Sequence, residues 1–188
     1  TRRLSSAASD VYKRQVLAMV NAPSYNPNNR ADLQSFKMRN RVLTDAMEPG
    51  STVKPFVVLA ALENGTADPD IIIDTGNGIM QIGGSRVRDS SKVGKADLAL
   101  ILKKSSNIGV AKLALNMPLE ALLGMYSSVG LGEMSGLNLV GETSGIFPNR
   151  RRWSKFEIAT LAFGYGLSVT PMQLAHAYAT LANKGMYE

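Results

Sequence analysis

Two side chains three residues apart could form a serine nucleophile and its base. Ser51 and Lys54 stand in the phrase Met-Glu-Pro-Gly-Ser-Thr-Val-Lys-Pro, just before an apolar run with helical spacing that ends at Gly65. A serine at a helix start faces free backbone N–H groups and the positive end of the helix dipole, which stabilise negative charge at its hydroxyl. Lys54 lies on the same face of such a turn. This is one geometry in which a serine can be deprotonated without a histidine.

The same spacing also has an ordinary structural interpretation. About one Ser-x-x-Lys is expected by chance in a chain of this length, and most such pairs are an N-cap serine followed by a solvated lysine. Pro55 favours the chemical interpretation, because it removes a donor and crowds the preceding turn where the helix should settle. We therefore expect the helix to begin late or irregularly, and such strain is more often tolerated at a working site than elsewhere.

A second polar group, Ser105-Ser106-Asn107, separates two predicted helices, one over residues 96–103 and one from about Asn107. A loop at such a junction can point two polar side chains into a cleft while the helices hold it rigid. The alternative is a pair of ordinary helix caps, for which Ser and Asn are favoured. Ser-x-x-Lys followed about fifty residues later by Ser-x-Asn is the ordered signature of penicillin-interacting serine transferases and hydrolases.

Four longer phrases, at residues 39–55, 104–114, 139–145 and 163–175, resemble class B penicillin-binding proteins, and within them the septal transpeptidases of cell division. The resemblance covers essentially residues 16–188. It implies an α+β fold, namely part of the penicillin-binding protein and serine β-lactamase-like transpeptidase fold. We expect mostly the helical lobe, with a few strands of the antiparallel sheet.

The resemblance assigns a role to each polar residue of the two motifs. Ser51 is the acylated nucleophile, and its backbone N–H forms half of an oxyanion hole. Lys54 is the general base, which must be neutral, a state that burial and nearby positive charge favour. Ser105 passes the proton toward the leaving amine, and Asn107 holds Lys54 and the peptide stem of the substrate. We also expect substrate contacts at Ser106, Tyr165 and Gly166, since Gly164-Tyr165-Gly166 permits a tight backbone near the cleft.

The substrate that the resemblance implies is a peptidoglycan stem peptide ending in D-Ala-D-Ala, and β-lactam antibiotics would acylate the same serine. The implied partners are the division machinery and a glycosyltransferase that uses lipid-linked substrate, with no nucleic acid. The implied location is the periplasmic face of the bacterial inner membrane. Two alternatives stay open: a hydrolase on the same scaffold, either a D,D-carboxypeptidase or a β-lactamase-like enzyme, and a degenerate penicillin-binding sensor module.

Composition and charge exclude several other classes of protein. A hydrophobic content of 45% with 19% charged residues indicates a globular chain with a core. No apolar run is long enough to predict a membrane span. Half of the net charge of +6 lies in residues 1–15. The charge on the remaining residues is too small to predict a nucleic-acid-binding surface. With no cysteine and His176 as the single histidine, the sequence predicts neither a metal site nor a cofactor.

We expect two segments of different origin. Residues 1–15 are polar, and their apolar residues follow neither helical nor strand periodicity. They resemble translated adapter sequence, so we expect a non-native leader. Residues 16–188 read as an internal fragment, a partial transpeptidase domain without its membrane anchor. The family's third motif, Lys-Thr/Ser-Gly, does not occur in the sequence, and we expect it in a C-terminal part beyond residue 188. We therefore predict little transpeptidation and weak penicillin acylation by this polypeptide alone.

The remaining periodicity predicts the other elements. Residues 16–21 read as a buried strand, and residues 71–74 as a brief one, followed by short extended pieces over 76–91. Helices are predicted over residues 119–129, from Ser154 to Phe163, and from Thr170-Pro171 to Gly185. The buried stripe of that last helix is predicted to be Leu174, Ala175, Tyr178, Leu181 and Ala182, with His176 on the opposite, exposed side.

Overall fold

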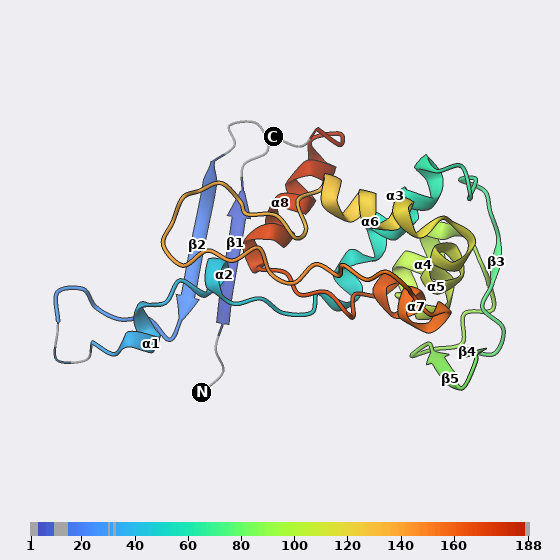
Figure 1. The fold of residues 1–188 in the computed structure, drawn as a ribbon, viewed down its shortest axis with the longest axis horizontal. Helices are drawn as coiled ribbons and strands as arrows, with labels where there is room; N and C mark the ends of the chain where they lie inside the picture. The colour runs from blue at the N-terminus through green and yellow to red at the C-terminus, as the bar shows by residue number, and fades with distance from the viewer. Residues whose placement is uncertain (1–3, 10–14, 30, 32, 187–188) are drawn as a thin grey trace. The chain divides into compact units, whose positions relative to one another are not determined.

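The computed structural model describes residues 4–9, 15–29, 31 and 33–186. Its elements divide between two compact units, which we call the helical unit and the strand unit (Figure 1). The helical unit comprises Glu48–Tyr126 and Pro148–Leu167, and the strand unit comprises Thr1–Met47, Ser127–Phe147 and Ser168–Glu188. Helices and short antiparallel strands occur together, which confirms the predicted α+β class.

The helical unit begins with a 3-10 turn, continues through five helices and includes four short strands. The strands pair antiparallel, β3 with β6 and β4 with β5, in two separate two-stranded sheets. The bounds are η2 Gly50–Val53, α3 Lys54–Glu63, β3 Ile73–Asp74, β4 Ile79–Ile82, β5 Ser85–Arg88, β6 Lys95–Ala96, α4 Leu98–Lys104, α5 Asn107–Asn116, α6 Leu119–Ser128 and α7 Lys155–Ala162. The last two residues of α6 belong to the strand unit.

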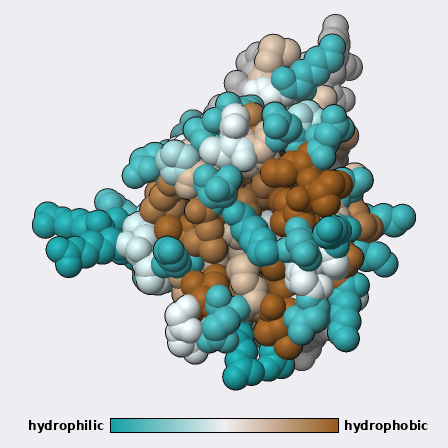
Figure 2. Space-filling view, turned by 90° about the vertical axis from the view of Figure 1, so that its right-hand side faces the viewer, coloured by the Kyte–Doolittle hydropathy of each residue, from teal (hydrophilic) through white to brown (hydrophobic). Residues whose placement is uncertain are grey.

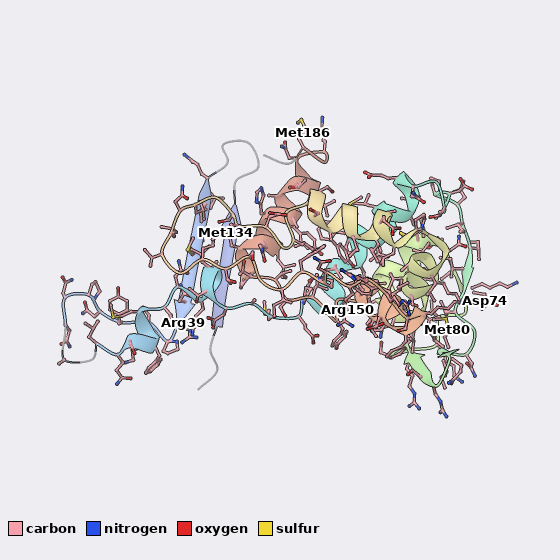
Figure 3. All side chains as sticks on the ribbon, viewed as in Figure 1. Arg39, Asp74, Met80, Met134, Arg150 and Met186 are labelled. Carbon is pink, nitrogen blue, oxygen red and sulfur yellow. The ribbon has the colours of Figure 1, made fainter. Side chains whose placement is uncertain are left out.

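Helix α5 lies at the centre of the helical unit. It packs against α3 and α7, and the β4–β5 hairpin closes over it. One core cluster joins these elements through Val87 of β5, Ile108 and Ala111 of α5, and Ala159 of α7, with Met80 of β4 against it (Figure 3). The position of α5 matters because its first residue is Asn107.

Helices α4 and α5 approach each other closely at Gly109. A Cβ added there would lie 2.8 Å from two side-chain carbons of Ile101, which is fully buried in α4. Gly124 of α6 has no atom within 4 Å of the same added carbon. The glycine in α5 is therefore a packing requirement, whereas the one in α6 is not.

The strand unit contains β1 Leu4–Ser9, β2 Val16–Ala22, α1 Ser35–Met38, α2 Arg41–Thr44 and α8 Pro171–Ala182. Strands β1 and β2 pair antiparallel with an irregularity between Ala8 and Ser9, and α8 and α2 pack against them. Strand β1 falls within residues 1–15, the segment predicted to be a non-native leader. The leader assignment itself stays a prediction, and residues 1–3 and 10–14 lie outside the described residues.

The predicted strand at residues 16–21 is confirmed, but its predicted burial is wrong. Leu17 and Val20 are 62% and 58% exposed. A strand is buried only where other elements cover both of its faces. Here β2 belongs to a two-stranded sheet, and Met19 is its contribution to the cluster with Val42, Leu43 and Met172.

Helix α8 starts as predicted, with Thr170 as N-cap in a capping box and Pro171 in its first turn, but the predicted buried stripe is wrong. Gln173 points inward, and its amide Nε2 donates to the Glu133 and Ser144 carbonyls at 2.6 and 2.9 Å. A polar side chain can be buried when its hydrogen bonds are satisfied. The spacing of apolar residues alone therefore predicted the wrong buried face for α8. The buried residues are Met172, Gln173, Ala177 and Thr180; Tyr178 is 42% exposed, and His176 is half-buried.

The surface of the helical unit mixes hydrophilic side chains with apolar patches on the side that Figure 2 turns to the viewer. Exposed apolar side chains of this unit include Ile72 and Ile79. Within the described residues no single helix has the length and apolarity to cross a membrane; α5 and α6 pass that test only together, and they are bent by 112° at the break between them.

The basic cluster at residues 150–152 is partly accounted for by local contacts. Arg150, labelled in Figure 3, pairs with Glu157 of α7, and its guanidinium lies 5.5 Å from the centre of the Trp153 ring. Arg151 and Arg152 are exposed. The cluster therefore lies in an exposed loop before α7.

We predict opposite stability changes for two glycine-to-alanine variants. Gly109→Ala should lower the free energy of unfolding by about 1–3 kcal/mol, because the new methyl group overlaps the buried Ile101 side chain. Gly124→Ala should raise it by up to about 1 kcal/mol, because alanine favours the helix and meets no atom there. Chemical denaturation of the two variants checks this; equal effects would contradict the packing argument.

Candidate active site

Ser51 lies on an irregular turn that leads into α3. Residues Gly50–Val53 form the 3-10 turn η2, and the α-helix begins only at Lys54, with Pro55 in its first turn. The predicted late helix start is therefore confirmed, and the Asn64 cap followed by Gly65 at φ 71° confirms the predicted end. Ser51 is exposed, and its carbonyl accepts the backbone N–H of Lys54, so the two motif residues are joined through the turn itself.

Lys54 carries a buried amine with three acceptors around it. The side chain is 2% exposed. Its Nζ lies 2.6 Å from the Ser105 carbonyl oxygen, 2.9 Å from the Ser105 Oγ and 2.7 Å from the Asn107 Oδ1. An ammonium has three donors and no acceptor, so these partners satisfy it fully. The structure thus brings Lys54, Ser105 and Asn107 into direct contact.

Ser105 offers two oxygens to one amine because of its backbone conformation. It is the C-cap of α4 in the left-handed region, at φ 53° and ψ 44°. A non-glycine residue there is uncommon and costs roughly 1–2 kcal/mol. The hydrogen bond from its N–H to the Leu102 carbonyl, at 3.0 Å, helps to hold it. The strain is thus located at the residue that supplies two of the three acceptors.

Asn107 is oriented by the β4–β5 hairpin. Its Nδ2 donates to the Arg88 carbonyl at 2.9 Å, at the end of β5. Because this carbonyl can only accept, the amide nitrogen is fixed on that side and Oδ1 is left facing Lys54. One side chain thus connects α5, α3 and β5.

Ser106 has a structural role that differs from the predicted substrate contact. It is fully buried, and its Oγ accepts the Gly109 N–H at 2.9 Å as the N-cap of α5. The same hydroxyl donates to Asp89 Oδ2 at 2.7 Å. The Ser106 hydroxyl is thus bonded within the protein, and substrate contact by Ser106 stays a prediction.

Asp89 is a member of this group that sequence reasoning missed. It follows β5, and its Oδ1 accepts the Ile108 N–H at 3.0 Å. Nothing in the local sequence relates it to Ser106, because the hairpin, and not a motif, brings the two together. In the sequence, Asp89 is recognisable only as an acidic residue at the end of a short extended segment in a polar stretch.

Burial governs the protonation of Lys54. It lowers the pKa of the amine from 10.5 to about 8, and the negative charge of Asp89 acts in the opposite direction. At pH 7 about a tenth of the amines are then neutral. The predicted contribution of nearby positive charge is not found, since the charge that acts on Lys54 is negative.

The acceptor set suits both protonation states of Lys54. The Ser105 carbonyl and the Asn107 Oδ1 can only accept, so they bind two N–H groups in either state. The Ser105 hydroxyl can accept from the ammonium or donate to the lone pair of the neutral amine. A proton can therefore pass between Lys54 and Ser105 without leaving a buried group unpaired.

The loop that contains Tyr165 and Gly166 is attached to the Ser51 turn. The Gly50 N–H donates to the Gly164 carbonyl at 3.1 Å, and a Cβ added at Gly164 would lie 2.0 Å from the Gly50 oxygen. The Gly166 N–H donates to Glu48 Oε1 at 3.1 Å. Tyr165 is 51% exposed and meets the Phe163 ring edge-on at 5.8 Å. Substrate contact by Tyr165 and Gly166 stays a prediction.

Comparison with known proteins decides the family. The model of the penicillin binding protein transpeptidase domain matches residues 6–188. The chain belongs to this family. Within the described residues no group of three or more His, Asp or Glu side chains could hold a metal ion.

Family relatives and solved structures agree with this assignment. The chain is 49% identical to the peptidoglycan D,D-transpeptidase FtsI of Escherichia coli strain K12, over 97% of this chain and 31% of that protein. It is 39% identical to the probable peptidoglycan D,D-transpeptidase PenA of Neisseria gonorrhoeae, over 94% of this chain and 30% of that protein. The apo structure of the transpeptidase domain of Burkholderia pseudomallei penicillin-binding protein 3 matches with a TM-score of 0.87 at 36% identity, over 99% of this chain and 52% of that one.

The chain spans about a third of the length of these curated relatives. The sequence resemblance to class B penicillin-binding proteins is confirmed, and within them the likeness to penicillin-binding protein 3. The predicted partial transpeptidase fold is confirmed as well.

We predict that Lys54 titrates with a midpoint near pH 8, well below the 10.5 of an ordinary lysine. The unfolded chain still holds this proton between those values and the folded chain does not, so the free energy of unfolding should rise with pH across that window. The ¹³Cε shift of labelled Lys54 gives the midpoint. Lys54→Met is the control, and it should remove this part of the pH dependence of unfolding; a midpoint above pH 10 would contradict the effect of burial.

We also predict that Gly164→Ala disrupts the Ser51 turn. The added methyl group would overlap backbone atoms of Gly50 at a position with φ 87°, so a loss of about 2 kcal/mol or more in stability is expected. Gly185→Ala is the matched control, because Gly185 has φ 84° but nothing within 4 Å of its added carbon. Thermal unfolding of both variants separates the overlap from the backbone cost, and a loss no larger at Gly164 would contradict the overlap.

Proposed function

We propose that this chain carries the nucleophile and the base of a serine D,D-transpeptidase that cross-links peptidoglycan during septal cell-wall synthesis. Ser51 is the nucleophile, Lys54 the general base, Ser105 the proton relay and Asn107 the residue that holds both Lys54 and the substrate. The observation that carries the proposal is the buried Lys54 amine in contact with Ser105 and Asn107, next to an exposed serine on the same turn.

The acylation step follows from these roles. Neutral Lys54 takes the proton of Ser51 while Oγ attacks the penultimate carbonyl of a stem peptide that ends in D-Ala-D-Ala. The C–O bond forms and the carbonyl oxygen becomes an oxyanion, which the Ser51 N–H at the start of the helix stabilises. The oxyanion then collapses to a carbonyl and the C–N bond breaks, as Ser105 delivers its proton to the departing D-alanine amine and takes up the proton that Lys54 accepted from Ser51. The product is an ester on Ser51, and an amine of a neighbouring stem resolves it into a cross-link.

The environment of Lys54 supports its role as base. A base with a pKa near 8 is neutral in part at pH 7 and still holds a proton strongly enough to remove it from a serine. The protonated amine that results keeps three acceptors, so the charge created in the step is not left unpaired. Tyr165 and Gly166 are proposed as substrate contacts, because their loop is bonded to the turn that carries Ser51.

The setting of the reaction is part of the same proposal. The substrate is a peptidoglycan stem peptide, and β-lactams would bind as strained analogues of it. We propose the periplasmic face of the inner membrane as the location, with the division machinery and a glycosyltransferase that uses lipid-linked substrate as partners. The support is the relationship to the peptidoglycan D,D-transpeptidase FtsI of Escherichia coli.

We predict that any covalent label from a fluorescent penicillin forms on Ser51. Labelling of this polypeptide alone is expected to be weak, and Ser51→Ala should abolish it because the nucleophilic oxygen is gone. Lys54→Arg should slow it by about a hundredfold or more, because arginine cannot become neutral. Intact mass and peptide mapping after denaturation check the site; equal labelling of Ser51→Ala would overturn the proposal.

The lifetime of the adduct separates this proposal from the alternatives. A transpeptidase should keep the penicilloyl ester for hours, whereas a carboxypeptidase or a β-lactamase-like hydrolase should release it with turnover. Adduct lifetime is measured by chasing with unlabelled penicillin. Absence of any adduct in a longer protein that contains this segment and a Lys-Thr/Ser-Gly motif would favour a degenerate sensor module.

A further inference from the structure

We propose that Asp89 is a positioning residue for acyl transfer, which ties the end of the β4–β5 hairpin to the first turn of α5 and thereby holds Ser105 and Asn107 against Lys54. Neither sequence motif includes Asp89, and it touches none of the groups proposed to react. Its effect is exerted through Ser106, which stands between the two residues that bind the Lys54 amine.

The carboxylate of Asp89 uses both of its oxygens on the first turn of α5. Oδ2 accepts the Ser106 hydroxyl at 2.7 Å, and Oδ1 accepts the Ile108 N–H at 3.0 Å. The Ser106 hydroxyl in turn accepts the Gly109 N–H at 2.9 Å. Asp89 and the N-cap serine therefore share the free donors of this helix start, which a negative charge also stabilises through the helix dipole.

The hairpin is attached to the Ser-x-Asn turn at two neighbouring points. Asp89 binds Ser106 and Ile108, while the carbonyl of Arg88 accepts the Asn107 amide at 2.9 Å. These contacts fix the residue on each side of Asn107. A turn held in this way can keep Ser105 in its left-handed conformation, in which its carbonyl and its hydroxyl both reach Lys54.

Asp89 also acts on Lys54 through its charge. Burial lowers the pKa of the Lys54 amine to about 8, and the Asp89 carboxylate raises it. Among the described residues, Asp89 is the charged group that acts on this amine from the elements around it. Asp89 therefore both shapes the turn and limits how far burial can drive the amine toward its neutral state.

The expected effect of Asp89 on acylation rests on the function proposed above. Its expected effect on the pKa and the contacts of Lys54 does not. The experiment therefore measures the two separately, in the whole polypeptide. It compares Asp89→Asn and Asp89→Ala with the same changes at Asp97. Asp97 is a matched control, because it is also a carboxylate at a helix start: it N-caps α4 by accepting the Leu100 N–H at 2.7 Å, and it is exposed.

Asp89→Asn removes the charge and keeps the size of the side chain. Its amide oxygen can accept the Ile108 N–H, and its nitrogen can donate to the Ser106 oxygen, which also accepts the Gly109 N–H; the Ser106 hydroxyl proton then loses its carboxylate acceptor. The ¹³Cε titration of Lys54 should then move to a lower midpoint than in the wild type. Asp97→Asn should leave that midpoint unchanged.

Asp89→Ala removes both hydrogen-bond acceptors as well as the charge. Exchange protection of the Ile108 amide should fall, and the rate constant of penicillin acylation should drop by about ten- to hundredfold, the usual effect of removing a partner that orients a working side chain. Asp97→Ala should lower protection at Leu100 instead and leave the acylation rate within about twofold.

Two results would overturn the proposal. One is a Lys54 midpoint in Asp89→Asn equal to that in Asp97→Asn. The other is an acylation rate in Asp89→Ala equal to that in Asp97→Ala at comparable loss of stability, which would mean that Asp89 only stabilises a helix. If Asp89→Ala does not fold, the Lys54 titration of Asp89→Asn decides. If neither the wild type nor a longer protein that contains this segment and a Lys-Thr/Ser-Gly motif forms an adduct, the proposed function fails, and the Lys54 titration still tests how Asp89 acts on the amine.

Discussion

The buried amine of Lys54 is the interaction on which the rest of this site depends. A lysine in the interior is costly unless its donors are satisfied, and here three oxygens from two residues satisfy them. Those oxygens come from a turn far along the chain from α3. The packing of α3 on α5 is therefore a chemical requirement as well as a source of stability, because it brings the acceptors to the amine.

The residues that bind the Lys54 amine are themselves held in place by neighbouring elements. The Ser-x-Asn turn is short, and a left-handed serine would not persist there without external support. Support comes from α4 on one side and from the end of β5 on the other, through Arg88 and Asp89. A small two-stranded hairpin thus helps to hold the acceptors of the Lys54 amine, and with them the proposed active site.

The sequence predicted the features that depend on neighbouring residues and missed those that depend on packing. Pro55, Gly65 and the Thr170-Pro171 pair marked helix ends correctly, because caps and proline act within one turn. The burial of β2 and the inward face of α8 were misjudged, since burial depends on what lies above an element. The sequence could not distinguish Ser106 from Ser105, because a serine that caps a helix and one that binds a ligand differ only in their hydrogen-bond partners.

The contact between Gly50 and Gly164 has a mechanical consequence. A methyl group on Gly164 would have no room between the two backbones, and one hydrogen bond joins them directly. The loop at residues 164–166 is therefore fastened to the turn that carries Ser51. Under the proposed function, a ligand contact at Tyr165 and an acyl group on Ser51 would share one backbone support.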